Sequence, residues 1–228
     1  MNSLLEFYYS SIGKKVLMSL SGLFLMVFLI EHLVGNLLLF ANDDGAMYEA
    51  YGNFLVSNPV IRFIEIFLFL GMALHAVIGV ILWIKNRITR PVKYRLFRLK
   101  DNATFASRTT IWSGSIIAIF LVIHLKTFFI PSRFATEKVS SYELIMQAFA
   151  NPWYDAFYLF ALLVLGYHLR HGFQSAFQTL GLRNKSYTPF LDGMAFIFWF
   201  LVPLGFALIP VYFYFYQQAL STVIMGAH

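Results

Sequence analysis

The chain has 228 residues, of which 59% are hydrophobic and 12% are charged, and its formal net charge is +6. Soluble domains carry about 25% charged residues, so this composition indicates an integral membrane protein and excludes an ordinary soluble enzyme. The chain contains no cysteine, which excludes disulfides, thiolate-bound zinc, thiolate-bound iron–sulfur clusters and thioether-attached haem. Any metal centre must therefore be held by histidine or carboxylate groups.

Five apolar runs reach the roughly 20 residues that a helix needs to cross a membrane. The first follows Lys14 and Lys15 and is too long for the apolar part of a signal peptide, so we expect it to stay as an anchor. No stretch is left for a soluble domain. We predict an all-α integral membrane protein whose residues 1–228 form one transmembrane domain, a five-helix bundle with spans at about 16–41, 60–84, 109–131, 152–181 and 191–219.

The charges of the loops predict the orientation of the bundle. The loop after the first span is acidic and has no lysine or arginine, the loop 131–151 is balanced, and basic residues follow the fourth span. The loop after the second span is strongly basic, with Lys85, Arg87, Arg90, Lys93, Arg95, Arg98, Lys100 and Arg108. Because cytoplasmic loops are rich in lysine and arginine, we expect a cytoplasmic N-terminus and an outer C-terminus, His228, in a bacterial cytoplasmic membrane. These basic residues suit anionic lipid, and we expect no nucleic acid partner.

Histidines lie in the first four predicted spans, and four of them form two pairs by depth. His32 lies eight residues before Phe40 and His124 seven before Pro131, near the outer ends of their spans, or about 10–12 Å at 1.5 Å per residue. His75 lies about 15 Å from the inner end of its span, and His168 lies at a comparable depth. Ionisable groups inside a membrane are costly and usually functional, although a single histidine is equally well explained by a hydrogen bond between helices.

Two stacked histidine pairs in a helix bundle are what two b-type haems with two imidazole ligands each require. We therefore expect His32 and His124 to bind the outer haem iron, and His75 and His168 the inner one. A zinc or di-iron centre fits this ligand set less well.

Glycines near the inner pair agree with this prediction. Gly71 and Gly79 flank His75 at four residues on either side, and Gly172 follows His168 by four, so a flat macrocycle has room to approach this helix face. Glycine is also common wherever membrane helices touch.

His171 lies three residues after His168, on nearly the same face but about one turn nearer the cytoplasm. The two cannot bind one iron from the same side, and the depth of His168 matches that of His75. We expect His171 to contact a haem propionate or to hydrogen-bond to a group that binds the iron, without binding the iron itself. Arg170 points toward a neighbouring helix or the interface, with a propionate contact as the weaker alternative, and Lys126 has the same geometry relative to His124.

Four runs carry a resemblance to a known family: SLSGLFLMVFLIEHLVGNLLLF, RFIEIFLFLGMALHAVIGV, FLVIHLKTFF and YHLRHGFQSAFQTLGL. They resemble the diheme cytochrome b membrane anchor of type B succinate:quinone oxidoreductases, the succinate dehydrogenases and fumarate reductases with one five-helix anchor. The similarity covers Ser11 to about Tyr216. Its specific parts are the order of the four histidine-bearing helices and the pattern H-x-x-[HN]-G-x-x-S at His168, Gly172 and Ser175.

The resemblance implies the same pairing of haem ligands that depth predicts. It also implies two partners on the cytoplasmic face, a flavoprotein subunit with FAD and an iron–sulfur subunit. The dicarboxylate chemistry would lie on the flavoprotein. This chain would be the quinone-reactive subunit, through which two haems connect the iron–sulfur subunit to a membrane quinone, typically menaquinone, near the outer side.

Quinone reduction needs two protons, so we expect an acidic or tyrosyl group near the outer haem. Glu65, near the outer end of the second span, and Glu49, in the outer loop, are the candidates for this acid. The alternatives are a Glu65–Arg62 ion pair and a solvated Glu49. Glu31 adjoins His32 but points about 100° away, where it can make a hydrogen bond between helices.

Gly166 departs from part of the family. Some fumarate reductases of this kind place a glutamate two residues before the haem ligand of the fourth span, as part of a proton path, and this chain has Gly166 there. The departure slightly favours succinate oxidation over fumarate reduction. Two other functions fit paired histidines: a diheme anchor of another quinone-linked enzyme, such as a formate dehydrogenase, a hydrogenase or a cytochrome b561, and a transporter with histidines in a proton route.

Overall fold

The computed structural model describes residues 3–88, 105–135 and 139–226, and every regular element in them is a helix. The predicted basic positions Arg90, Lys93, Arg95, Arg98 and Lys100, together with His228, lie outside the described residues. The helices are α1 (Ser3–Tyr9), α2 (Ser11–Leu37), η1 (Leu38–Phe40), α3 (Ala46–Ser57), α4 (Pro59–Ile88), α5 (Phe105–His124), η2 (Leu125–Phe129), α6 (Ile130–Phe134), α7 (Ser141–Ala148), α8 (Pro152–Thr179), α9 (Thr188–Phe196), η3 (Ile197–Leu201) and α10 (Val202–Gly226).

Long apolar helices dominate the described part of the chain. Four runs are long and apolar enough to cross a membrane: Ser11–Phe40, Pro59–Ile88, Thr109–Phe134 and Thr188–Gln218. A fifth crossing is counted when α7 and α8, which meet at an angle of 98°, are taken together. Large apolar side chains such as Val27 and Leu163 remain 65% and 75% exposed, as expected of surfaces that face lipid. The expected all-α transmembrane bundle is confirmed, and its division into domains stays a prediction.

Local sequence signals set where these helices begin. The Ser10 hydroxyl accepts a hydrogen bond from Gly13 N at 2.9 Å, and Asn151 caps α8 in the same way through Trp153 N at 2.9 Å. Pro152, the first residue of α8, has no N–H that would need a partner there. These caps satisfy backbone N–H groups that the first helical turn leaves free.

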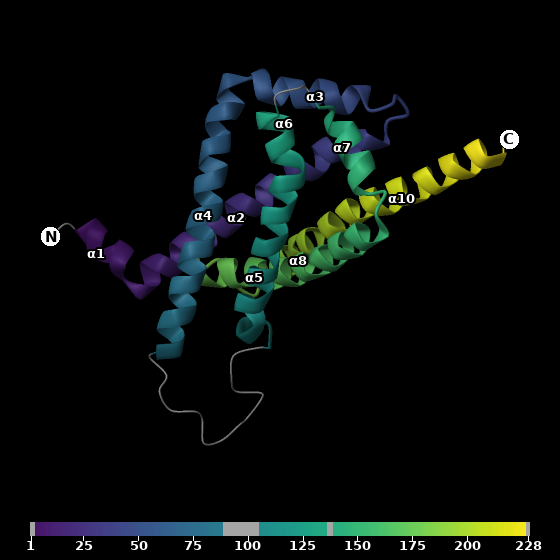
Figure 1. Cartoon of the computed structure of the whole chain (residues 1–228). Helices are drawn as coiled ribbons and strands as arrows, with labels where there is room; N and C mark the ends of the chain where they lie inside the picture. Colours follow the sequence, from purple (N-terminus) through teal and green to yellow (C-terminus); the bar gives the residue numbers. More distant parts are fainter. Residues whose placement is uncertain (1–2, 89–104, 136–138, 227–228) are drawn as a thin grey trace.

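Helix α8 lies at the centre of the bundle and packs against α2, α5 and α10, while α2 also packs against α4. One face of α8 is buried along its whole length. On this face a Cβ at Gly166 would lie 2.6 Å from the Trp199 carbonyl oxygen, so glycine allows α8 to approach η3. Helix α3 lies across the ends of α4 and α6, and the two chain termini lie on opposite sides of the molecule (Figure 1).

The core has two separate clusters. We call the end of the bundle where α2 starts and α4 and α8 finish the inner end, and the opposite end, near α3 and α7, the outer end. The inner cluster contains Met26, Leu169, Phe173, Leu191, Ala195 and Phe198. The outer cluster contains Leu39, Ile145, Phe149, Tyr158, Ile209 and Phe213, and further aromatic side chains pack against it. Tyr158 of the outer cluster contacts His124, and Leu169 of the inner cluster follows His168 on α8.

Candidate functional site: two histidine pairs

The inner pair consists of His75 on α4 and His168 on α8. Their ring centroids are 6.3 Å apart and the ring planes are inclined at 75°. The second histidine of α8, His171, lies one turn further inward and is half-buried. The structure therefore places His168, and not His171, against His75.

Two buried serines hold the rings of the inner pair. Ser21 on α2 lies with its Oγ 3.3 Å from Nδ1 of His75, and Ser113 on α5 lies 3.0 Å from Nδ1 of His168. Each serine donates its own hydroxyl proton to a carbonyl three residues earlier, Met18 O at 3.1 Å and Thr110 O at 3.0 Å. Because that proton is already used, the serine oxygen accepts from an imidazole Nδ1–H. Nε2 of each histidine then carries a free lone pair, as a metal ligand must.

The outer pair consists of His32 on α2 and His124 on α5. Their ring centroids are 5.8 Å apart and the planes are inclined at 84°. Tyr158 Oη lies 2.9 Å from Nδ1 of His124. Phe28 stacks on His32 at 5.3 Å, and Phe206 lies 5.5 Å from the same ring. The outer pair is thus enclosed mostly by aromatic rings.

The spacing within each pair fits two imidazoles on opposite sides of one metal ion. A metal–imidazole bond is about 2.0–2.1 Å long and the ring centre lies roughly 1 Å beyond the nitrogen, which puts two opposed rings about 6 Å apart. Within the described residues no group of three or more histidine, aspartate or glutamate side chains is arranged to hold a metal ion. Two ligands at each site suit haem, whose macrocycle supplies the other four nitrogens, better than zinc, which takes four ligands from its surroundings.

The glycines beside the inner pair serve helix packing. A Cβ at Gly71 would meet the Phe24 ring at 3.1 Å, and one at Gly79 would meet the end of Met18 at 3.4 Å. Gly172 has Met26 at the same distance of 3.4 Å. These glycines bring α4 and α8 close to side chains of α2, which is the role that glycine commonly has in membrane helices.

Arg170 points to a neighbouring helix, as expected. Its guanidinium lies 5.4 Å from the centre of the Trp199 ring, which is the geometry of a cation–π contact. Lys126, in the π-helical turn η2 directly after His124, is exposed.

Glu65 has two cationic partners. It forms an ion pair with Arg62, three residues earlier on α4, and its Oε2 lies 2.7 Å from Arg133 at the end of α6. The Glu65–Arg62 pair that the sequence offered as an alternative is therefore present, and Arg133 adds a second cation. This carboxylate joins α4 to α6 at the outer end.

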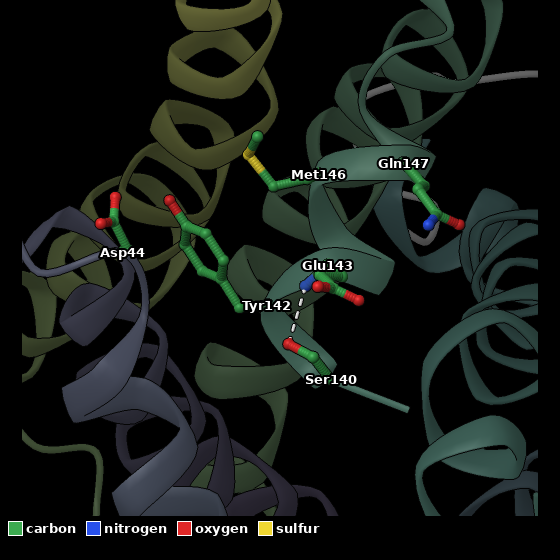
Figure 2. A pocket seen from close by; sticks show the side chains of 6 residues that line it. All are labelled: Asp44, Ser140, Tyr142, Glu143, Met146 and Gln147. Carbon is green, nitrogen blue, oxygen red and sulfur yellow. Dashed lines mark hydrogen bonds between the residues drawn. The ribbon is translucent and has the colours of Figure 1, made fainter. Parts of the chain in front are cut away.

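Glu49 joins α3 to the start of α7. Its Oε1 accepts hydrogen bonds from Ser140 Oγ at 2.9 Å and from Tyr142 N at 2.8 Å. Both partners line an open pocket of about 330 Å³, in which Asp44 lies beside the Tyr142 ring and the other side chains come from the α7 segment (Figure 2). The pocket is lined by Asp44, Ser140, Tyr142, Glu143, Met146 and Gln147. Glu49 is therefore not simply solvated: it does not line the pocket, but it binds two of the residues that do.

Glu31 makes the hydrogen bond between helices that its position suggested. Tyr51 on α3 donates its hydroxyl to Glu31 Oε1 at 2.6 Å. Burial, together with the nearby Glu31 carboxylate, raises the pKa of Tyr51 to about 12. Tyr51 consequently remains a hydrogen-bond donor at any physiological pH.

Sequence reasoning missed three polar groups that contact the pairs, Ser21, Ser113 and Tyr158, and a buried carboxylate at the start of α8, Asp155. Asp155, in the first turn of α8, is only 7% exposed, and neither carboxylate oxygen has a hydrogen-bond partner within the described residues. An acidic residue four positions into an apolar run was a visible signal. The two serines were harder to find because small hydroxyl residues are common in membrane helices and only the fold shows what they contact.

Comparison with known proteins gives one match. Residues 86–204, more than half of the chain, match the family described as the succinate dehydrogenase/fumarate reductase transmembrane subunit. The matched segment includes His124 and His168, one histidine from each pair. No curated protein and no solved structure matches the chain.

Proposed function

Because the chain belongs to the succinate dehydrogenase/fumarate reductase transmembrane subunit family, we propose that it is a diheme anchor of the type B kind. In this proposal His75 and His168 hold the inner haem b, and His32 and His124 hold the outer one. When bound, the two haems would supply one-electron carriers between an iron–sulfur subunit and membrane quinone. The other haem anchors and the transporter lose support, since neither belongs to this family.

The observation that carries this proposal is the presence of two separate imidazole pairs. With centroid distances of 6.3 and 5.8 Å, each pair could hold one metal ion between its two imidazoles. In the inner pair the serine hydrogen bonds leave Nε2 of both rings free to bind iron. The enclosing aromatic and aliphatic side chains exclude water, and a low dielectric around a haem is one means of setting its potential.

The pocket at the outer end is the proposed site for the quinone head group. Its volume of about 330 Å³ is at the lower limit of ordinary ligand sites. The Tyr142 hydroxyl can donate to a quinone carbonyl, whereas the Ser140 hydroxyl already donates to Glu49. Glu49 contacts both residues and is our first choice for the acid. Glu65 is the second choice, because two arginines already neutralise its carboxylate. We propose menaquinone as the quinone.

The partners and orientation follow from the same proposal. A flavoprotein with FAD and an iron–sulfur subunit would dock on the inner face, beside the predicted basic loop, with the N-terminus in the bacterial cytoplasm. Succinate oxidation is the proposed direction, since position 166 has no room for the glutamate of the fumarate reductase proton path: even a Cβ there would lie 2.6 Å from a backbone oxygen.

The experiment is to purify the chain with its bound partners in mild detergent and to measure b-type haem per chain as the reduced pyridine complex. Two haems per chain and a covalent or tightly bound flavin in the complex are expected. One haem would mean that one pair has another role, and a well-folded chain with none would contradict the proposal. Succinate-dependent reduction of a menaquinone analogue by the same preparation tests the quinone step.

A further inference from the structure

Helices α2 and α5 carry the same sequence pattern. It reads SGLFLMVFLIEH at Ser21–His32 and SGSIIAIFLVIH at Ser113–His124, so each helix has a Ser-Gly followed, eleven residues after the serine, by a histidine of the outer pair. Each serine contacts a histidine of the inner pair on a different helix. Each of the two helices therefore contributes a serine contact to the inner pair and a histidine to the outer pair.

The spacing of eleven residues explains how one helix reaches both levels. Eleven residues advance an α-helix by about 16 Å and turn it by about 20° beyond three full turns. The serine and the histidine of each helix thus lie on one face, separated by about 16 Å along the axis. The inner histidines come from α4 and α8, so all four helices take part in the inner site, whereas both histidines of the outer site come from α2 and α5.

We propose that Ser21 and Ser113 are positioning residues of the inner haem site, and that the repeated S-G-x9-H motif of α2 and α5 joins the two sites. Each serine holds the Nδ1–H of an inner histidine, so that the ring keeps one tautomer and one orientation with Nε2 toward the iron. The inference rests on the proposed diheme function and adds residues that the family pattern of histidines does not contain.

The glycine of each motif lets the serine come close to its histidine. A Cβ at Gly22 would lie 3.1 Å from Cε1 of His75, and one at Gly114 would lie 3.7 Å from Cε1 of His168. The first contact is tighter than side chains normally accept and the second is an ordinary van der Waals distance. The motif on α2 therefore depends on its glycine more than the motif on α5 does.

Removal of a serine should act on the inner haem alone. Outer partners of metal-bound histidines typically contribute about 10–100-fold in metal affinity, and an acceptor at Nδ1–H makes the ligand more basic. Ser21→Ala and Ser113→Ala should each weaken inner-haem binding by about that factor. The midpoint potential of the inner haem should rise, because a less basic ligand stabilises ferric iron less, and the outer haem should keep its potential.

The test is a redox titration of both haems in the intact complex, with the ferric EPR signals recorded on the same samples. Ser19→Ala is the matched control: Ser19 is also buried on α2, but its hydroxyl bonds to the Lys15 carbonyl at 2.9 Å. Ser21→Ala and Ser113→Ala should shift the potential and the EPR signal of one haem only, while Ser19→Ala shifts neither. Gly22→Ala should displace the inner haem more than Gly114→Ala.

Unchanged inner-haem signals in both serine variants, or equal shifts of both haems, would overturn the inference. If an alanine variant does not accumulate, Ser21→Thr and Ser113→Thr decide the matter, since they keep the hydroxyl and should keep the inner potential near that of the wild type. A threonine variant that loses the inner haem as alanine does would also contradict it. Fewer than two haems in the unmodified complex would instead contradict the proposed function.

Discussion

The inner and outer histidine pairs have nearly the same ring separation but different surroundings. Both inner rings bind a serine hydroxyl through Nδ1, whereas in the outer pair His124 contacts a tyrosine hydroxyl and His32 packs against two phenylalanine rings. The outer end also has the buried Asp155 and a pocket lined by polar side chains. Similar ligand geometry is thus combined with two different environments.

The comparison distinguishes the features required to hold a metal ion from the further features required to react with a quinone. Holding an iron requires two opposed rings with a defined tautomer, and both ends provide the rings. Exchanging electrons and protons with a quinone requires in addition an opening and titratable groups, and the outer end has both in the pocket whose lining residues bind Glu49. The inner end instead has hydrogen bonds that keep its rings in place.

The largest effect that tests this comparison is loss of one haem. His168→Ala should reduce the haem content from two to one per chain, because the proposed inner haem would lose one of the two histidines that hold it, whereas His171→Ala should keep both. The pyridine haem assay measures this directly. Loss of a haem in His171→Ala with both retained in His168→Ala would reverse the choice of ligand on α8.

Gly166→Ala tests the close contact between α8, which carries His168, and η3. The new Cβ would meet the Trp199 carbonyl at 2.6 Å, so we expect a loss of about 1–3 kcal/mol in unfolding free energy, as for other overpacked sites. Thermal unfolding of the detergent-solubilised complex measures it. Gly193→Ala on α9, where no atom lies within 4 Å of the added Cβ, is the control and should cost less than half as much.

Glu49→Ala probes the outer end alone. It leaves Tyr142 N and Ser140 Oγ without their acceptor, which should cost about 1–3 kcal/mol and lower quinone turnover, with both haem potentials unchanged. Glu49→Gln keeps an acceptor oxygen, so it should restore stability but not turnover. Full turnover in Glu49→Gln would remove this residue from the quinone site. Exposed Glu6 on α1, which does not line the pocket, provides the control, as Glu6→Ala.

Tyr158→Phe is the outer counterpart of the serine variants. It removes the hydroxyl 2.9 Å from Nδ1 of His124, so the outer haem potential should rise while the inner one stays constant. Redox titration shows which haem moves. Tyr154→Phe, which removes a longer contact of 3.4 Å to the Tyr158 hydroxyl, should have a smaller effect in the same direction. A shift of the inner haem would mean that the two sites are not supported separately.

The smallest expected effect concerns Asp155. Its carboxylate oxygens receive no hydrogen bond within the described residues, and a buried polar group without a partner is destabilising. Asp155→Asn should therefore keep stability or raise it by about 1 kcal/mol, measured by thermal unfolding against exposed Asp192→Asn. A marked loss of stability would show that the carboxyl group has a partner in the assembled complex.

Much of this architecture was predictable because a membrane restricts the lengths and conformations of the segments that cross it. Apolar length sets the spans, and the regular rise of a helix converts residue number into depth. His32 and His124 could therefore be paired, as could His75 and His168, without any knowledge of the fold. The Glu65–Arg62 ion pair was predictable for a similar reason, because residues three apart on a helix are neighbours.

Sequence alone determined that this is an all-helical membrane chain with two histidine levels and an acidic outer loop. The tertiary structure decided that Ser21 and Ser113 face the inner rings, that Glu49 binds the start of α7, and that Gly166 meets a backbone oxygen. The physical reason is that sequence does not fix how the helices are rotated relative to one another. Periodicity gives the height and the face of each side chain along its own helix, but the partner depends on how neighbouring helices are rotated and packed, which contacts distant in sequence determine together.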